Sequence, residues 1–553
     1  MRQRTKEWYK SGAPWIWLNA GAVSISVLMV IGLIGLISAR GLVYFWPSDV
    51  LEGHYRESNG QEIPVLGEID TVEIIPASRA RDSGYTIEGD SEVTRYLIKV
   101  GNRDIYGADF KLVMEPFLTE VTYPEDVLVV ERREWGNFYG HLKSITENGN
   151  VIAEGAEAKK LLPARLARSV DLFHQVRSIQ KHEIGAINFQ LEKLRLKKRG
   201  LELKGVKDPS AYAALEEEAK SLEQKYKQLR EKMTELIVQS RRDSIIVTTI
   251  TGQEITLPLA KVVRVHYPNA MGLWQKIGFY FEKLWEFVSD EPREANTEGG
   301  IFPAIFGTVM MVLLMSVIVT PFGVVAAVYL REYAKQGLLI RLIRIAVNNL
   351  AGVPSIVYGV FGLGFFVYFL GGNIDTLFFP EAQPAPTFGT PGLLWASLTL
   401  AILTLPVVIV ATEEGLARIP SSIREGSMAL GATRAETLWR IVIPMASPAM
   451  MTGLILAVAR AAGEVAPLML VGVVKLAPSL PLDGNFPYLH MDRKFMHLGF
   501  HIYDVGFQSP NVEAARPLVY ATSLLLIIVI VLLNLAAIYV RNHLREKYRA
   551  LEN

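Results

Sequence analysis

Apolar runs, each long enough to cross a bilayer, mark the beginning and the second half of this 553-residue chain. A membrane-spanning helix needs about 20 predominantly apolar residues, because the hydrocarbon core is about 30 Å thick and each residue adds about 1.5 Å. Six runs meet this requirement, at residues 16–39, 301–330, roughly 346–370, 392–411, 450–474 and 517–540. Because the backbone must satisfy its own hydrogen bonds in lipid, the sequence predicts an α-helical integral membrane protein with six transmembrane helices.

The first apolar run has two interpretations. Trp15 and Trp17 lie at its start, and Tyr44, Phe45 and Trp46 follow its end, as in the aromatic belts of a membrane anchor. The alternative is a cleaved signal peptide, but the apolar core is longer than usual and the small-residue cleavage pattern is poor. We therefore expect residues 1–46 to form a cytoplasmic N-terminus and a retained first anchor.

Most Lys and Arg residues of the short loops fall on one side of the predicted membrane, which favours a cytoplasmic location for that side. An even number of spans places both chain ends there. The long stretch of residues 47–300 then lies outside, which in a bacterial cell is the periplasm. We expect a multi-pass inner-membrane protein with both termini cytoplasmic and a short tail at residues 541–553.

Within the external stretch of residues 47–300, the spacing of apolar residues differs from one part to the next. Alternating runs between turn-forming Gly, Asp and Asn residues predict strands in residues 53–155. In residues 163–242, apolar residues recur at steps of three and four on both sides of a break, which predicts an antiparallel coiled-coil hairpin. Alternation returns in residues 245–265, so a β-hairpin there could pair with the earlier strands. The stretch therefore reads as an α+β periplasmic domain.

Residues 272–288 form a predicted amphipathic helix. One helical face gathers Leu273, Trp274, Ile277, Phe281, Leu284, Trp285 and Val288. The charged residues lie largely off this face, as in a helix that lies in the membrane interface. Packing against the β-rich region is the alternative interpretation.

A charged segment, residues 413–447, joins the fourth and fifth apolar runs; we call it the coupling segment. Ser421 or Ser422 can cap a first helix that runs to residue 430. Gly431 permits a sharp turn, because glycine adopts left-handed backbone angles without strain. Thr433 can cap a second helix, which Pro444 ends at residue 442. The sequence thus predicts a compact helix–turn–helix that projects from the membrane.

Two polar clusters interrupt the apolar runs. Arg460 and Glu464 lie four residues apart, on one helical face of the fifth run. An ionised group at mid-membrane costs roughly 2.5–3.5 kcal/mol, so such residues normally face a bundle interior or a water path. The planar fork of an arginine suits an oxyanion such as phosphate or sulfate. A purely structural ion pair is the alternative.

The second cluster comprises Asn348, Asn349 and Ser355 at the head of the third run, where Gly352 and Pro354 loosen the helix. Backbone groups freed by such a break are tolerated where they line a cavity. A proline kink with amide packing between helices is the alternative.

The coupling segment resembles the cytoplasmic "EAA" loop of bacterial ABC-importer permeases. That loop has a Glu with two small residues, a Gly four residues later, and an I-x-L-P-like end. The matching positions are Glu425, Gly426, Ser427, Gly431, Ile441 and Pro444. Gly426 and Ser427 stand where Ala is usual, and Ile443 stands where Leu is usual.

Three further stretches resemble the phosphate-specific (Pst) permeases, with an order and spacing close to the PstA-type subunit. They are N-L-A-G-V-P-S-I-V-Y-G at residues 349–359, L-P-V-V-I-V-A-T-E-E at 405–414 and A-R-A-A-G-E-V-A-P-L at 459–468. The resemblance covers about residues 300–540 and does not extend to the insertion.

This resemblance implies a type I importer permease core at residues 301–540, which translocates inorganic phosphate by alternating access. It also implies the partners: a homologous second permease, an ATPase dimer and a periplasmic phosphate-binding protein. The coupling segment would dock into the ATPase, and Arg460, Glu464, Asn348, Asn349 and Ser355 would belong to the substrate pathway.

The sequence disfavours several other functions. With no cysteine, the chain forms no disulfide or thiolate site, and its net charge of +1 gives no general attraction for nucleic acid. It has no G-x-x-x-x-G-K-[ST] motif, so we expect no ATP hydrolysis by this chain and no cofactor. His490, His497 and His501 are spaced loosely, and we predict ordinary loop residues rather than a metal site.

Two alternatives to phosphate import stay open. One is an importer of another oxyanion, such as sulfate or molybdate. A membrane sensor is less favoured, because the longest predicted cytoplasmic stretch, residues 413–447, is too small for an output domain.

Overall fold

The computed structural model describes residues 8, 10–87, 89, 91–293, 296–509 and 512–548. Arg2, Arg4, Lys6 and Arg549, which contribute to the predicted orientation, lie outside these residues.

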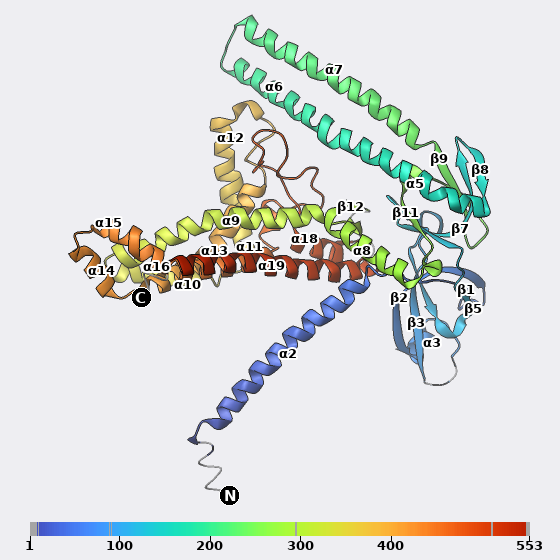
Figure 1. Ribbon diagram of the computed structural model, residues 1–553, viewed down its shortest axis with the longest axis horizontal. Coiled ribbons are helices and arrows are strands. Elements are labelled where there is room, and N and C mark those ends of the chain that lie inside the picture. Colours follow the sequence, from blue (N-terminus) through green and yellow to red (C-terminus); the bar gives the residue numbers. More distant parts are fainter. Residues whose placement is uncertain are drawn as a thin grey trace.

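Six helices in the described part of the chain are long and apolar enough to cross a membrane, the number expected from the sequence. They cover Ala13–Val43, Phe302–Tyr333, Ser355–Phe378, Leu393–Ala417, Arg434–Gly463 and Ala515–Glu546. In Figure 1 these spans correspond to α2 (Ala13–Val43), α9 (Phe302–Val328), α11 with α12 (Ser355–Phe361, Gly372–Phe378), α13 (Leu393–Ala417), α15 with α16 (Arg434–Thr437, Ile443–Gly463) and α19 (Val512–Tyr548).

The third predicted span, residues 346–370, was placed wrongly. Its first residues end a separate helix, α10 (Leu338–Leu350), and the span itself starts at Ser355. Pro354 precedes that start in an extended conformation, because proline lacks an N–H and cannot continue the preceding helix. A π-helical stretch, Gly362–Gly371, then carries the span on to Phe378.

The fifth predicted span, residues 450–474, was also wrong, and so was the helix end at Pro444. A continuous helical segment runs from Arg434 to Gly463 through that proline. The π-helical turn Leu438–Val442 directly precedes Pro444 and accommodates its missing N–H. The helix stops instead at Gly463, because Glu464 is extended and Pro467 follows.

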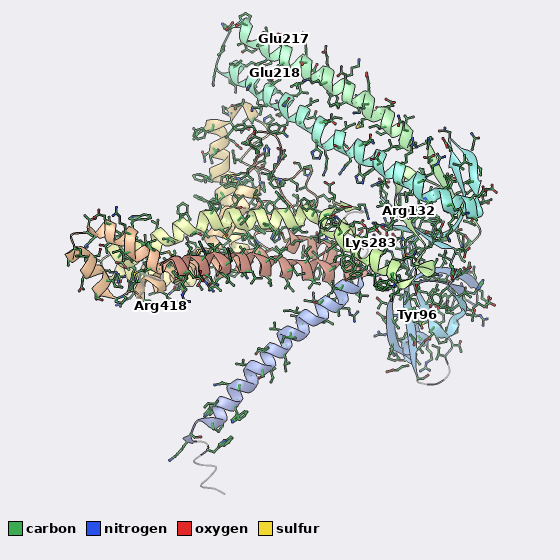
Figure 2. The ribbon with its side chains drawn as sticks, viewed as in Figure 1. Tyr96, Arg132, Glu217, Glu218, Lys283 and Arg418 are labelled. Atoms are coloured by element: carbon green, nitrogen blue, oxygen red, sulfur yellow. The ribbon has the colours of Figure 1, made fainter. Side chains whose placement is uncertain are left out.

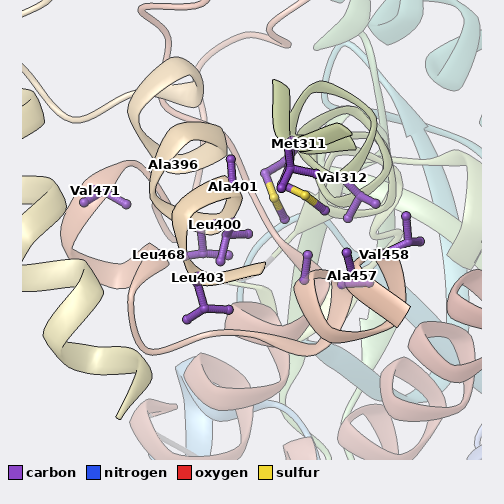
Figure 3. Close-up of a cluster of buried hydrophobic side chains, with 14 of the residues drawn as sticks. Met311, Val312, Ala396, Leu400, Ala401, Leu403, Ala457, Val458, Leu468 and Val471 are labelled. Atoms are coloured by element: carbon purple, nitrogen blue, oxygen red, sulfur yellow. The ribbon is translucent and has the colours of Figure 1, made fainter. Parts of the chain in front are cut away.

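The membrane bundle is built around α13, which packs against both α9 and α16. Figure 3 shows the buried side chains of this core, among them Met311, Leu400 and Ala457. Small residues allow close approach: a Cβ added to Gly453 would lie 2.7 Å from Ala411 Cβ. By contrast, α2 diverges from the bundle in Figure 1 and meets α19 only toward its C-terminal end, near Gly41.

Two antiparallel sheets form the β-rich part of the insertion. The first has the order β4 (Phe110–Met114), β3 (Glu92–Lys99), β2 (Glu62–Pro76), β1 (Val50–Arg56) and β5 (Leu118–Thr122). The second has the order β10 (Glu254–Pro258), β9 (Asp243–Thr248), β7 (Asn137–Glu147), β6 (Val127–Arg132) and β11 (Val262–His266), with β8 (Asn150–Glu154) also on β7. Short elements complete the insertion: α3 (Ala77–Asp82), α4 (Arg103–Tyr106), β12 (Pro292–Arg293) and β13 (Glu298–Gly299).

The helical excursion leaves and re-enters the second sheet, because β9 pairs with β7 as the sequence predicts. It comprises α5 (Gly155–Ser178), a π-helical turn (Ile179–Ile184), α6 (Gly185–Leu203) and α7 (Pro209–Ser240). The first helix starts at Gly155, two turns before the predicted start, and contains Pro163. Ile187, Leu194 and Leu222 form the buried centre between the two arms, where the three- and four-residue spacing places them.

The hairpin lies over the loops of the membrane core (Figure 1). Phe189 of α6 packs edge-on against His490, with ring centroids 5.4 Å apart. Lys193 lies 5.4 Å from the ring centroid of Phe486, and a Cβ on Gly200 would be 4.0 Å from Glu381 Cβ. Figure 2 places Glu217 and Glu218 near the free end of the hairpin.

Helix α8 (Leu273–Ser289) joins the insertion to the bundle. On the bundle side, Phe287 packs against Phe45 at 5.1 Å between ring centroids, and Tyr280 packs against Trp46 at 6.1 Å. On the sheet side, Glu131 of β6 accepts a 2.5 Å hydrogen bond from Lys283. Figure 2 shows Lys283 at this junction.

The charges of this junction are buried and mutually paired. Arg264 Nη1 lies 2.9 Å from Glu286 Oε2, and Arg293 Nη2 lies 2.7 Å from Glu286 Oε1. Burial alone raises the pKa of Glu131, but Lys283 and Arg264 outweigh it, so that pKa lies well below its usual range. Because each buried charge depends on its partners, removal of one carboxylate leaves cations uncompensated.

We predict that Glu131→Gln destabilises the protein by about 3 kcal/mol, because it removes the carboxylate nearest to Lys283 and leaves Glu286 as the only buried carboxylate, among the described residues, paired with Lys283, Arg264 and Arg293. Glu134→Gln is the control, since Glu134 meets Lys261 at 3.8 Å with both side chains mostly exposed. Thermal unfolding in detergent should separate the two variants, and equal melting temperatures would contradict the prediction.

Candidate functional site

The coupling segment folds as two short helices at the end of the bundle opposite the β-sheets (Figure 1). Helix α14 (Ser421–Ala429) is followed by Gly431 at φ 92°, the left-handed turn expected there. Thr433 caps α15 as predicted: its hydroxyl accepts from Glu436 N–H at 3.2 Å. The predicted Ser421 or Ser422 cap is wrong, because Pro420 occupies the N-cap position and makes no side-chain bond.

Buried polar contacts hold the two coupling helices together and fix them to the bundle. Ser427 and Thr437 share a hydroxyl–hydroxyl hydrogen bond of 2.8 Å. Arg424 forms an ion pair of 2.8 Å with Glu332 at the end of the second span. It also donates to the carbonyl oxygen of Ile419 at 2.7 Å. Arg424 thus links α14 directly to the end of that span.

The outer surface of the coupling segment is apolar at its tip. Leu430 is 92% exposed and Trp439 is 69% exposed. Glu425, Gly426 and Gly431 are exposed as well, whereas Ile441 and Pro444 are half-buried. The large exposed side chain of Leu430, at the turn beside Gly431, is a candidate contact for another protein.

Arg460 and Glu464 lie where the fifth span ends, not within it. Arg460 is in the last turn of α16, and Glu464 is the extended residue after the helix. Their side chains still meet, with 3.6 Å between Arg460 Nε and Glu464 Oε1, and the guanidinium is 32% exposed. The contact is longer than a good charge-assisted hydrogen bond, which leaves donors of the guanidinium available.

The helix break at Ala351–Pro354 adjoins the break that follows Arg460. Gly359 of α11 lies so close that an added Cβ would be 2.7 Å from Pro467 Cα. Tyr358 donates to the carbonyl oxygen of Leu350 at 2.5 Å, which satisfies one backbone group freed by the break. The fold therefore brings together two stretches that lie about 100 residues apart in the sequence.

Asn348, Asn349 and Ser355 are not joined to Arg460 by any hydrogen bond between the described residues. Asn348 instead lines a separate cavity of about 300 Å³ near the coupling segment. Its other polar walls are Arg331, Arg344, Glu413 and Glu414. Arg344 Nη2 lies 2.5 Å from Glu413 Oε1. Sequence reasoning missed this pair, although Glu413 lies in the quoted stretch 405–414.

The three histidines between the fifth and sixth spans are buried, which corrects the prediction of ordinary loop residues. His490 pairs with Asp483 at 2.9 Å. His497 caps α18 (Leu498–Tyr503) by accepting from Gly499 N–H at 3.1 Å, and His501 follows within that helix. Both are less than 3% exposed. Burial lowers the pKa of His497 to about 3 and that of His501 to about 4.

We predict that the protein loses stability as the pH falls from 7 to 5. The folded chain keeps His501 neutral down to a pKa of about 4, whereas the unfolded chain takes up that proton near pH 6.5. His501→Leu should reduce the pH dependence by up to about 1.4 kcal/mol per pH unit, because it removes one such group. Melting temperatures across this range test it, and an unchanged slope would contradict it.

Comparisons with known proteins give a consistent picture. A family profile described as "Binding-protein-dependent transport system inner membrane component" matches residues 319–550. Phosphate transport system permease protein PstA 1 of Mycobacterium tuberculosis (strain CDC 1551 / Oshkosh) is 35% identical over 247 residues, 44% of this chain and 71% of that protein.

Two further relatives match this chain over different shares of their own lengths. Probable ABC transporter permease protein YqgH of Bacillus subtilis (strain 168) is 32% identical over 193 residues, 35% of this chain and 59% of YqgH. Probable phosphate transport system permease protein PstC of Methanocaldococcus jannaschii is 28% identical over 311 residues, 53% of this chain and 93% of that protein. The chain therefore belongs to the PstA/PstC-type family of ABC-transporter permeases.

Proposed function

We propose that this chain is a permease subunit of an ATP-driven importer and that it translocates inorganic phosphate across the inner membrane. The carrying observation is Arg460, a half-buried guanidinium at the end of an apolar span, only loosely paired with Glu464. It lies beside two adjoining helix breaks, where backbone groups can line a path. The names of the PstA and PstC relatives support phosphate as the cargo.

In this proposal Arg460 binds the oxyanion and Glu464 regulates its release. The guanidinium offers several donors in one plane, which match the oxygens of phosphate. Without substrate, Glu464 compensates the arginine charge, and an arriving anion competes with it. That competition keeps binding weak enough for the anion to move on. Asn348 and Asn349, before the break, and Ser355, directly after it, belong to the same pathway.

The coupling segment passes the motion of a separate ATPase subunit to the bundle. Its exposed tip, Leu430 with Trp439, fits an apolar cleft on that subunit. Glu425, Gly426, Ser427, Gly431, Ile441 and Pro444 set its shape. The chain itself performs no hydrolysis.

The rest of the proposal concerns the topology of the chain and its other partners. Both termini are cytoplasmic, a second homologous permease packs beside this one, and a phosphate-binding protein delivers substrate on the periplasmic side. The insertion of residues 47–300, with its coiled-coil hairpin, forms the periplasmic domain.

We predict that Arg460→Ala lowers phosphate uptake at least about tenfold, because charge-assisted hydrogen bonds to an anion contribute roughly 1.5–3 kcal/mol. The assay is radiolabelled phosphate uptake in cells without their own high-affinity system, with sulfate and molybdate as competitors. Arg545→Ala, at an exposed position on α19, is the control. Normal uptake by the Arg460 variant in an assembled complex would remove Arg460 from the pathway.

We predict that Leu430→Asp separates the permease from its ATPase, because it places a charge on the apolar tip. Co-purification of the ATPase subunit and ATP-dependent uptake should both fall about tenfold or more, the effect of losing a buried leucine at an interface. Leu203→Asp, at another exposed leucine, on the helical hairpin, is the control. If co-purification and uptake stay normal, the tip is not the docking site.

A further inference from the structure

A cavity of about 830 Å³ lies in the insertion, between α5, β11 and α8. Most of its wall is apolar, contributed by Leu162, Leu166, Val170, Val263, Val265 and Met271. Cavities of this size and lining are typical of sites for small amphipathic molecules. Nothing in the proposed transport cycle uses this cavity.

The cavity opens beside the exposed aromatic face of α8. Trp274, Phe281 and Trp285 are each more than 60% exposed. They project from one side of the helix, since steps of four and seven residues return to one face. Trp285 also lines the cavity, so the aromatic face continues into it.

Helix α8 stands at the ends of the membrane spans. Its other side contacts Phe45 and Trp46, which end the first span, and α9 enters the bundle at Phe302 shortly after α8 ends. Exposed tryptophans at the end of membrane helices are typical of the lipid headgroup region. The cavity is therefore within reach of the bilayer surface.

Most charged groups around the cavity have partners. Arg264 is paired with Glu282 at 2.8 Å and with Glu286 at 2.9 Å, and Arg293 pairs with Glu286 at 2.7 Å. The other carboxylate of the lining, Asp290, accepts from the Ser289 hydroxyl at 3.0 Å. Lys159 has no ion pair among the described residues, and its ammonium lies 4.1 Å from the Tyr267 ring centroid.

We propose that this cavity binds one anionic phospholipid from the outer leaflet of the inner membrane. An acyl chain lies along the apolar wall from Trp285 toward Leu166. The phosphate lies at the mouth, where the exposed Lys159 supplies the positive charge. The insertion is thereby held at the membrane surface by a lipid as well as by α8.

The test uses the full chain in nanodiscs that contain phosphatidylglycerol with a photoactivatable acyl chain. After illumination, cross-linked peptides are mapped by mass spectrometry. We expect cross-links in residues 159–174 and 262–275, in addition to those along the membrane spans. Cross-links confined to the membrane spans would overturn the proposal.

Matched variants on α5 separate this site from lipid around the bundle. Ala167 lines the cavity and is exposed, so Ala167→Trp should fill the space and lower cross-linking of both segments at least about fivefold. Ala164→Trp, on the same helix but outside the cavity lining, should leave it unchanged. Equal cross-linking in both variants would overturn the proposal.

A separate comparison of two phospholipids tests the preference for an anionic headgroup. With wild-type protein, phosphatidylglycerol should cross-link at residues 159–174 more strongly than phosphatidylcholine, and Lys159→Glu should remove the difference. No difference between the two lipids in the wild type would overturn the anionic assignment. A soluble fatty acid that labels the same segments as well as the phospholipid would overturn the bilayer as the source.

Discussion

In the bilayer, each backbone N–H and C=O group must find its partner within the protein, and this requirement determines where the chain can break its helices. The two breaks in the membrane bundle, at Ala351–Pro354 and at Glu464–Pro467, lie against each other. Helix α11 serves both: Gly359 allows the backbone of the second break to approach, and Tyr358 satisfies a carbonyl oxygen of the first. The only ion pair described at this point, Arg460 with Glu464, is positioned by that juxtaposition.

A second group of contacts, made by helix α8, holds the insertion against the bundle. Helix α8 carries apolar contacts on the side toward the first span and buried charges on the side toward the second sheet. Buried ion pairs add little net stability, but they tolerate few alternative arrangements, because any misplacement leaves a charge unpaired. The angle between the β-sheets and the membrane bundle is thus fixed by a few residues of one 17-residue helix.

The number of membrane spans, the helical hairpin and the turn at Gly431 could be predicted from the sequence, because each depends on local periodicity or on one residue's backbone preference. The bounds of the third and fifth spans could not. Pro444 looked like a helix stop, but the π-helical turn before it lets the helix continue, and that turn has no clear local signal. The helix end at Gly463 has a local signal in Pro467, but the length of the apolar run concealed it.

The sequence identified the charged pair of the candidate site, but it did not predict where the pair lies in the fold. Arg460 with Glu464 was identified because charges in an apolar run are costly, yet the pair lies at the end of the helix. Asn348 faces a different cavity, with Arg344 and Glu413. The burial of His497 and His501 depends on long-range contacts, such as that between Leu498 N–H and Thr308 Oγ1, about 190 residues apart.

The π-helical turn Ile179–Ile184 sets the rotational phase of the helical hairpin. Phe189, Lys193 and Gly200, the three points where α6 meets the loops of the membrane core, lie on one face because their spacing is close to whole helical turns. Loss of one residue from the π-helical turn would rotate everything beyond it by about 100° and direct that face away from the core. The hairpin can therefore change in length by whole helical turns beyond Gly200. Insertions or deletions before Phe189 must instead preserve the direction in which the contact face of α6 points.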